Sequence, residues 1–351
     1  MAKELQVPIR AEVEALPRYI PGRTQPGAIK MSSNESVTPP SSMVVEAAVK
    51  ATATAHRYPD LTCAPLREAL ARRYGVEDSQ ICVGAGSSSI LVATLLALCE
   101  PGAEVIFPWR SFESYPIAVP ATHGIPVPIP THEDGAHNIS GMLDAITPRT
   151  AAMILCSPNN PTGSALALAE IRRIATEIPP HILLIVDEAY GEFVADENVF
   201  TAIPLIADHP NILVMRTFSK AYALAGLRVG YCVAHPDIAA AVQAVSIPFA
   251  VSAPAIAAAI AALNDREALK ERVSAVVAER TRVYEEACKR GIPAAPSQAN
   301  FLWFPGAGED FVGACREAGV IVRPFPEGVR VTIGDREEDD RFLEALSALV
   351  K

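Results

Sequence analysis

Lys220 and Asp187 are the residues whose types and surroundings point most clearly to chemistry. Lys220 follows a strand-like apolar run at 211–218 and precedes a segment rich in alanine and leucine. A lone lysine is more often a solvated surface charge. In apolar surroundings, however, desolvation lowers the lysine pKa and favours the neutral amine that a Schiff base needs. Asp187 ends LLIVD, the most apolar strand of the chain, where an isolated carboxylate is costly without a partner.

An anion site is predicted in VGAGSSSI (83–90), which follows a strand and opens a helix. The free N–H groups of Ser87, Ser88 and Ser89 at a helix N-terminus would attract a phosphate. The same segment invites a dinucleotide-binding interpretation, but Ser89 replaces the third glycine of that fingerprint, and Glu104 precedes the next strand where an acid should follow it. A nicotinamide-dependent dehydrogenase is therefore the weaker hypothesis.

The LLIVDE string also fits the magnesium-binding strand of a P-loop ATPase. That interpretation requires an upstream G-x-x-x-x-G-K-[ST] motif. The chain contains no Gly-Lys pair, so this class of enzyme is excluded.

Short apolar runs separated by turn residues set the architecture. Runs of this kind, apolar on both alternating faces, occur at 80–84, 103–108, 151–157, 181–190, 211–218 and 226–234. Such runs are typical of strands buried in a parallel or mixed sheet. Helical patterns lie between them at 64–75, 87–102 and 168–179. The alternation predicts an open α/β sheet, mostly parallel, with helices on both faces.

A second, smaller α+β unit is expected after residue 265. A long charged helix at 266–291 is followed by short strands around ANFLWF, VIVRPF and GVRVTI and by a helix from about 335. We expect a large domain over 36–262 and a small domain made of 1–35 and 263–351. A cleft between two domains is the usual place for a small-molecule site.

The charge and the cysteine content limit the possible binding partners and the cellular compartment. Thirty basic and 40 acidic side chains give a net charge of −10 with no Lys/Arg-rich block, which argues against nucleic acid and anionic membranes. The seven cysteines are scattered, with no zinc-like spacing, so we expect buried thiols in a reducing compartment and no metal site. The charged N-terminus favours a cytoplasmic protein. The uncharged stretch 244–263 suits a loop and buried helix better than a membrane span, because Ser and Pro interrupt its first half.

Four segments in fixed order carry a family resemblance: SPNNPTG (157–163), VDEAY (186–190), TFSKAYALAGLRVGY (217–231) and GVRVTIG (328–334). Together they resemble the fold-type-I pyridoxal-phosphate aminotransferases, in the branch of histidinol-phosphate and aromatic amino acid aminotransferases. The likeness extends from Tyr19 through SSNE (32–35) and HRYPD (56–60) to SQANF (297–301). It therefore covers nearly the whole chain.

The resemblance implies roles for residues around pyridoxal 5'-phosphate. Lys220 would form the Schiff base and move the substrate proton, and Asp187 would stabilise the protonated pyridine nitrogen. Tyr190 and Asn160 match the groups that hydrogen-bond the phenolic oxygen, and Phe112 occupies the place of an aromatic that stacks on the ring.

The resemblance also assigns the cofactor phosphate and the subunit arrangement. The matching phosphate ligands are Ser87, Ser88, Ser89, Ser219 and Arg228. Tyr58 matches a tyrosine that reaches the phosphate of the neighbouring subunit's cofactor, which implies a homodimer.

Substrate contacts are implied on the small-domain side. Arg330 matches the arginine that holds the substrate α-carboxylate as a bidentate pair. Arg323 is assigned either to that carboxylate or to the distal end of the substrate. Tyr19 and Asn34 are further candidates, and Asn300 could assist.

The expected activity is transfer of the amino group from phenylalanine or tyrosine to 2-oxoglutarate. Ser36 and Val37 stand where histidinol-phosphate enzymes usually continue Asn-Pro, and aromatic residues gather in WRSFESYP (109–116) and around Phe249. The alternative is a histidinol-phosphate aminotransferase, which would need a dedicated cation for the phosphate. A lyase or decarboxylase on the same scaffold stays open. A cofactor-binding regulator would need a DNA-binding module, and no such pattern precedes Tyr19.

Overall fold

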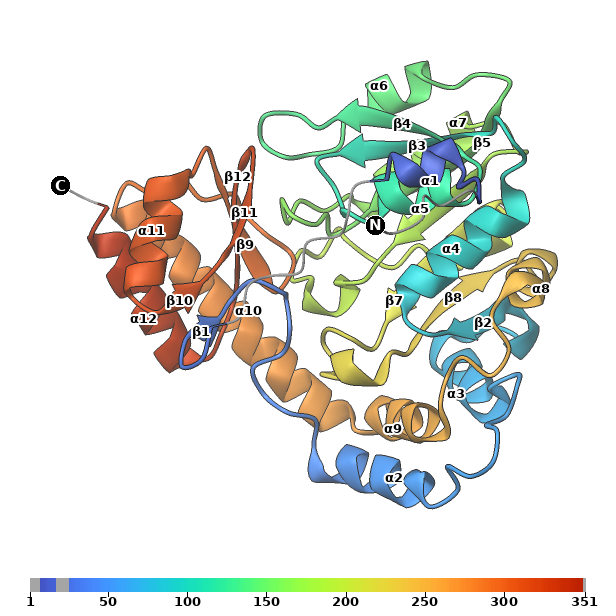
Figure 1. The fold of residues 1–351 in the computed structure, drawn as a ribbon, viewed down its shortest axis with the longest axis horizontal. Coiled ribbons are helices and arrows are strands. Elements are labelled where there is room, and N and C mark those ends of the chain that lie inside the picture. Colours follow the sequence, from blue (N-terminus) through green and yellow to red (C-terminus); the bar gives the residue numbers. More distant parts are fainter. Residues whose placement is uncertain (1–6, 17–24, 350–351) are drawn as a thin grey trace, which may run out of the picture.

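A seven-stranded sheet organises the larger part of the molecule (Figure 1). The computed structural model describes residues 7–16 and 25–349. The strand order is β2-β8-β7-β6-β5-β3-β4. The strands are β2 (Ile81–Gly84), β3 (Glu104–Trp109), β4 (Ile125–Pro130), β5 (Thr150–Cys156), β6 (Leu183–Asp187), β7 (Ile212–Thr217) and β8 (Gly230–Ala234). Only β8 runs antiparallel to its neighbours, so the predicted mostly parallel α/β sheet is confirmed.

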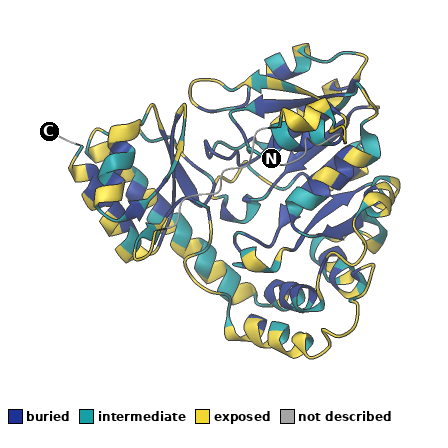
Figure 2. Cartoon of the chain, in the orientation of Figure 1, coloured by how far each residue is buried: buried dark blue, intermediate teal, exposed yellow. Residues whose placement is uncertain are grey.

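Helices cover both faces of this sheet, so its central strands are buried throughout (Figure 2). One face packs against α4 (Ser87–Leu98), α5 (Tyr115–Ala121) and α8 (Pro236–Val245). The other packs against α3 (Ala64–Tyr74), α6 (Ile139–Asp144), α7 (Leu168–Glu177) and α9 (Ala253–Asn264), with α2 (Ser42–Thr52) outside α9. Short 3₁₀ turns occupy Asp78–Gln80, Gly191–Phe193, Ile203–Ala207 and Ala225–Leu227.

Strand β4 was not predicted from the sequence. Its residues, IPVPIP, include three prolines, which lack the N–H that a central strand needs. The structure resolves the conflict by placing β4 at the sheet edge, where it pairs with β3 alone.

The uncharged stretch 244–263 forms the end of α8, a connecting loop and most of the buried helix α9. Helix α9 is therefore part of the core, as expected. No helix within residues 7–16 and 25–349 is long and apolar enough to span a membrane.

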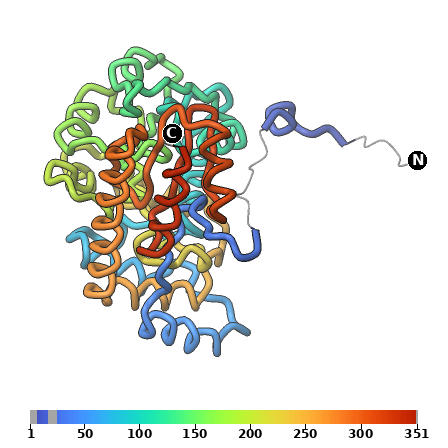
Figure 3. The backbone as a smooth tube through the Cα atoms, turned by 90° about the vertical axis from the view of Figure 1, so that its left-hand side faces the viewer, coloured from blue at the N-terminus to red at the C-terminus, as the bar shows by residue number. Residues whose placement is uncertain are grey.

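A smaller three-stranded sheet, in the order β11-β12-β9, lies beside the large one. Its strands are β9 (Phe301–Pro305), β11 (Arg323–Phe325) and β12 (Gly328–Thr332). Helices α10 (Arg266–Lys289), α11 (Glu309–Glu317) and α12 (Arg336–Ser347) share a core with it, and Figure 3 views this group from its outer side.

The N-terminal part of the chain meets both units. Strand β1 (Ile29–Lys30) pairs in parallel with β10 (Val320–Ile321) of the smaller unit. Helix α1 (Ala11–Glu14) lies near α5, and Arg10 before it donates to the carbonyl of Ala121 at 2.9 Å. The exact domain boundaries at 36 and 262 stay a prediction.

All seven cysteines are free thiols. Five are buried, but Cys99 is only partly buried and Cys288 is exposed. The expectation of buried thiols is therefore wrong for Cys288, which lies near the end of the long surface helix α10.

Candidate active site

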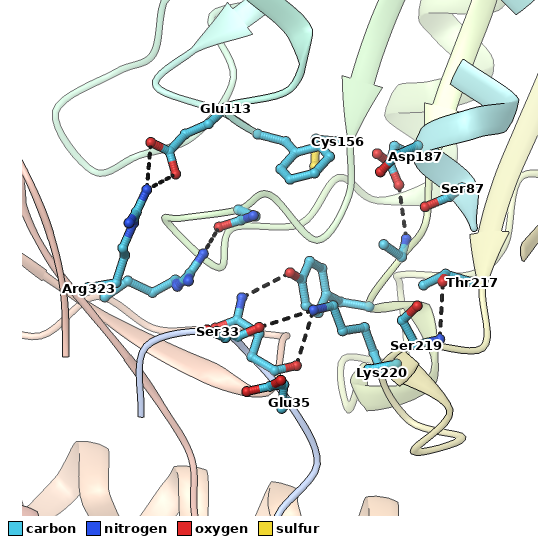
Figure 4. Close-up of a pocket in the computed structure, with 18 of the residues that line it drawn as sticks. Ser33, Glu35, Ser87, Glu113, Cys156, Asp187, Thr217, Ser219, Lys220 and Arg323 are labelled. Carbon is cyan, nitrogen blue, oxygen red and sulfur yellow. Dashed lines mark hydrogen bonds and ion pairs between the residues drawn. The ribbon is translucent and has the colours of Figure 1, made fainter. Parts of the chain in front are cut away.

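A cavity of about 330 Å³ lies where the carboxyl ends of β5, β6 and β7 face the smaller sheet (Figure 4). The strand register aligns the ends of β5, β6 and β7, because Cys156 pairs with Asp187 and Asp187 pairs with Met215, near the end of β7. Carboxyl ends of parallel strands are the usual ligand-binding edge of such sheets. Most candidate residues line this cavity: Asn34, Ser87, Ser88, Phe112, Asn160, Asp187, Tyr190, Ser219, Lys220, Arg228, Arg323 and Arg330.

Lys220 follows β7 directly and extends its amine into the cavity. The Nζ atom donates to the carbonyls of Ser33 at 3.3 Å and Asn34 at 3.2 Å. Desolvation, with a smaller contribution from Arg330, lowers the lysine pKa to about 7. A large fraction of the amine is thus neutral near pH 7, as a nucleophile requires.

Asp187 is buried at the end of β6 with only neutral donors around it. Its Oδ2 accepts from the Tyr115 hydroxyl at 2.9 Å, and its Oδ1 accepts from the Ala189 N–H at 3.2 Å. Desolvation raises its pKa to about 6, although both hydrogen bonds act in the opposite direction. Within the described residues Asp187 forms no salt bridge. A cationic ligand group in the cavity would supply the missing charge.

An anion site forms where α4 begins. Gly86 precedes the helix with φ of +84°, and a Cβ there would lie 2.6 Å from Arg228 Nη2. A Cβ on Gly230 would lie 2.5 Å from the backbone nitrogen of Ser87. Both positions require glycine for this close packing. The turn therefore places the N–H groups of Ser87 and Ser88 beside the Arg228 guanidinium, which also donates to Ser219 Oγ at 3.2 Å.

Ser89 does not belong to this anion site, so the sequence assignment needs correction. It does not line the cavity. Its N–H and its hydroxyl both donate to the carbonyl of Gly86, at 3.1 and 3.0 Å. Both donors of Ser89 are therefore used within the first turn of α4, whereas the sequence analysis had counted them as free to bind a phosphate.

Tyr190, Asn34 and Asn160 form a polar group beside Lys220. Tyr190 Oη accepts from Asn34 Nδ2 at 2.9 Å, which leaves its own hydrogen for a ligand. Asn160 Oδ1 accepts from Arg330 Nη1 at 2.5 Å, so the NH₂ group of the Asn160 amide faces away from Arg330. Asn300 is buried behind them and donates to the carbonyl of Asn34 at 3.3 Å.

Two arginines reach the cavity from the smaller sheet. Arg323 of β11 and Arg330 of β12 are direct partners in the antiparallel register. Arg330 is buried and donates to the carbonyl of Ser32 at 2.6 Å in addition to Asn160. Arg323 is paired with Glu113, a residue of the larger unit.

Phe112 and Tyr58 differ in position. Phe112 lines the cavity and meets Tyr115 edge-on, with ring centroids 5.7 Å apart. Tyr58 lies outside the cavity, is 83% exposed and stacks on Phe249 at 4.7 Å. A single subunit therefore does not bring Tyr58 to its own site. Tyr19 lies outside the described residues.

Sequence reasoning missed several residues of the site. Glu113, Cys156 and Thr217 line the cavity, and Tyr115 supports Asp187 from behind. Cys156 ends β5 and Thr217 ends β7, and these two strands flank β6 in the sheet. A correct strand order would therefore have predicted both residues next to Asp187. Tyr115 was noted among the aromatic residues of 109–116, but its contact with Asp187 was not predicted, and Glu113 gave no signal, because their partners are distant in sequence. Within the described ranges, no cluster of three or more potential metal ligands occurs.

A reactive lysine, a buried aspartate and an anion-binding turn around one cavity define a site for a phosphorylated, amine-reactive cofactor. Comparison with known proteins identifies the class. The aminotransferase class I and II family model matches residues 26–346. The chain is 43% identical to an aromatic amino acid aminotransferase of Streptomyces avermitilis over 96% of each chain. It is 45% identical to one of Mycolicibacterium smegmatis, covering 97% of this chain and 95% of the relative.

Solved structures give the same fold. Histidinol-phosphate aminotransferase from Sinorhizobium meliloti in complex with pyridoxal-5'-phosphate has a TM-score of 0.88 at 27% identity, covering 97% of this chain and 98% of that one. A Thermus thermophilus aspartate aminotransferase tetra mutant has a TM-score of 0.84 at 25% identity, covering 97% and 99%. The chain belongs to the class I and II aminotransferase family and has its fold-type-I architecture.

The cavity fits pyridoxal 5'-phosphate, the cofactor that this family implies. Asp187 is a buried carboxylate that no cation of residues 7–16 or 25–349 pairs with, which suits the protonated ring nitrogen. The turn at Gly86 and Ser87, with Arg228 and Ser219, suits the phosphate. Lys220 stands between them as the amine that the cofactor's aldehyde requires.

Proposed function

We propose that this aminotransferase transfers the amino group of phenylalanine or tyrosine to 2-oxoglutarate. The observation that carries the proposal is Lys220, an amine of lowered pKa in one cavity with Asp187 and Arg330. The choice of an aromatic donor is supported by near full-length relatives that bear that name at 43% and 45% identity.

When bound, pyridoxal phosphate supplies an aldehyde that condenses with amines and a ring that accepts an electron pair. Asp187 would stabilise the proton on the ring nitrogen, because its buried carboxylate would gain a positive partner there. Lys220 would hold the aldehyde in the resting enzyme and, as a free amine, would carry the proton released from the donor Cα. Tyr190 and Asn160 would hydrogen-bond the phenolic oxygen, and Phe112 would pack against the ring.

The remaining residues hold the phosphate and the substrate. The N–H groups of Ser87 and Ser88, with Ser219 and Arg228, bind the phosphate as charge-assisted donors. Arg330 holds the α-carboxylate of both substrates, since a planar guanidinium matches a carboxylate. Both substrates use one pocket in turn, which gives ping-pong kinetics.

Steady-state kinetics with three donors test the substrate assignment. With 2-oxoglutarate as acceptor, phenylalanine or tyrosine is expected to exceed histidinol phosphate in kcat/KM by about tenfold, which needs about 1.4 kcal/mol of differential binding. A preference for histidinol phosphate would instead assign the enzyme to that reaction, which the structural likeness to the Sinorhizobium meliloti enzyme makes the second candidate.

We further propose a homodimer in which Tyr58 reaches the partner's cofactor phosphate. Tyr58, Phe249 and Ile247 are exposed apolar residues on neighbouring loops, as expected for a surface that a partner covers. Tyr58→Phe is expected to weaken cofactor affinity about 5- to 30-fold, the scale of a lost hydrogen bond to a charged group. Sedimentation should still show a dimer, because the ring remains. Unchanged affinity, or an active monomer, would contradict the shared site.

A cytoplasmic location completes the proposal. Seven free thiols suit a reducing compartment. Fractionation of cells that produce the protein, with activity as the readout, tests it.

A further inference from the structure

The distal end of the cavity contains a carboxylate that the proposed reaction has not used. Glu113 lies in the loop between β3 and α5, and its two oxygens accept from Arg323 Nη2 at 3.0 and 2.8 Å. The Arg323 side chain is 12% exposed and that of Glu113 is 31% exposed. Both residues line the cavity. In Figure 4 the pair lies across the cavity from Asp187 and Ser87.

The position of Arg323 brings this pair next to the substrate. Arg323 and Arg330 are directly opposite on β11 and β12, so their side chains emerge on the same face about 5 Å apart at Cβ. A substrate whose α-carboxylate is held by Arg330 therefore has Arg323 and Glu113 beside the rest of its length.

A second ion pair joins the same two segments outside the cavity. Arg110 Nε and Nη2 donate to Glu327 at 3.0 and 2.8 Å, and neither residue lines the cavity. The loop at 110–113 is thus tied to the β11–β12 hairpin independently of Glu113. Glu113 adds something that the outer pair does not, namely a negative charge inside the cavity.

We propose that Glu113 is a specificity-determining residue that selects against amino donors with a distal anion. A neutral aromatic side chain leaves the Glu113–Arg323 pair intact. A distal carboxylate has to displace the Glu113 carboxylate from the guanidinium and then lie close to it, which like charges oppose. The acceptor 2-oxoglutarate, with its distal carboxylate, meets the same competition. This inference rests on the proposed aromatic donor.

The test compares the holoenzyme with Glu113→Gln and, as a matched control, Glu327→Gln. The kcat/KM of the donor half-reaction is measured with phenylalanine and with glutamate, which carries a distal carboxylate. In Glu113→Gln, the ratio of glutamate to phenylalanine is expected to rise at least tenfold, and the KM for 2-oxoglutarate to fall. In Glu327→Gln the ratio is expected to stay at its wild-type value.

Further variants identify the responding cation. Adding Arg323→Gln to Glu113→Gln should abolish the gain for glutamate, and Glu113→Asp should restore part of the wild-type selectivity. Ratios within twofold of wild type in Glu113→Gln, or an equal rise in Glu327→Gln, would overturn the inference while leaving the aromatic reaction in place. A wild-type enzyme that does not convert phenylalanine would instead overturn the proposed function and this inference with it.

Discussion

The charged residues at the two ends of the cavity differ in their bonding partners. At the cofactor end, Asp187 is bonded to the Tyr115 hydroxyl and the Ala189 N–H, and Lys220 to two backbone carbonyls. At the distal end, Arg323 is bonded to the carboxylate of Glu113. Asp187 and Lys220 thus have only neutral hydrogen-bond partners. Arg323, in contrast, is paired with a residue of opposite charge.

This difference separates two tasks. Desolvation raises the pKa of Asp187 to about 6 and, with a smaller contribution from Arg330, lowers that of Lys220 to about 7, so both groups gain from a ligand that supplies charge or reacts. The distal pair gains nothing from a neutral side chain and opposes a charged one. The proposed roles therefore put binding and chemistry at one end of the cavity and substrate selection at the other, so variants at the two ends should change different properties.

Lys220→Ala should have the largest effect. Because one amine both reacts with the cofactor and carries the proton, transamination is expected to fall at least about 10⁴-fold. The cofactor should still bind in part, through Asp187, Arg228 and the α4 N-terminus. Turnover and cofactor absorbance measure the two effects, with Lys50→Ala on the exposed face of α2 as control. Wild-type turnover would remove Lys220 from the mechanism.

Asp187→Asn should fold, bind cofactor and lose about 10³-fold in kcat. A neutral amide no longer favours the protonated ring that accepts electrons. Absorbance of bound cofactor together with kcat for phenylalanine separates loss of binding from loss of chemistry. A near-normal kcat would mean that another group stabilises the ring proton.

The pH dependence of cofactor loading tests the low pKa of Lys220. An amine with a pKa of about 7 is neutral above pH 7 and charged below it. The rate at which the cofactor-free enzyme takes up pyridoxal phosphate should therefore level off above about pH 8 and fall about tenfold per unit below pH 7. Stopped-flow absorbance gives the profile. A midpoint near 10.5, the ordinary lysine value, would contradict a desolvated amine.

Tyr115→Phe should have the smallest effect at the cofactor end. The Tyr115 hydroxyl lowers the pKa of Asp187, so its removal raises that pKa further above the ordinary value. Asp187 then loses its charge at higher pH, and the acid limb of the kcat profile should move upward. We expect kcat to fall about threefold to tenfold, the range for the loss of one hydrogen bond of ordinary strength. An unshifted acid limb would show that Tyr115 serves only the packing.

How far the sequence predicted this site depends on whether the determining contacts are local. Asp187 ends one strand and Lys220 follows another, and the apolar residues of each strand specify it locally, so both residues could be singled out from the sequence. Ser89 was misassigned because the first helical turn folds back onto Gly86, a detail that composition does not specify. Strand β4 was missed because its prolines argue against any strand except one at an edge.

The distal end shows the opposite limit. Glu113 and Arg323 are 210 positions apart, and their pairing depends on how two sheets are packed together. Arg323 was left between two roles for that reason. No local pattern indicates its carboxylate partner Glu113, and the role proposed for that partner is what assigns Arg323 to the distal end of the substrate.

A single-turnover reaction of the holoenzyme with phenylalanine, without any acceptor, tests the central claim most directly. We predict one equivalent of the corresponding 2-oxo acid per subunit, no carbon dioxide, and loss of the resting cofactor absorbance that 2-oxoglutarate then restores. Release of carbon dioxide, or no 2-oxo acid at all, would contradict an aromatic amino acid aminotransferase.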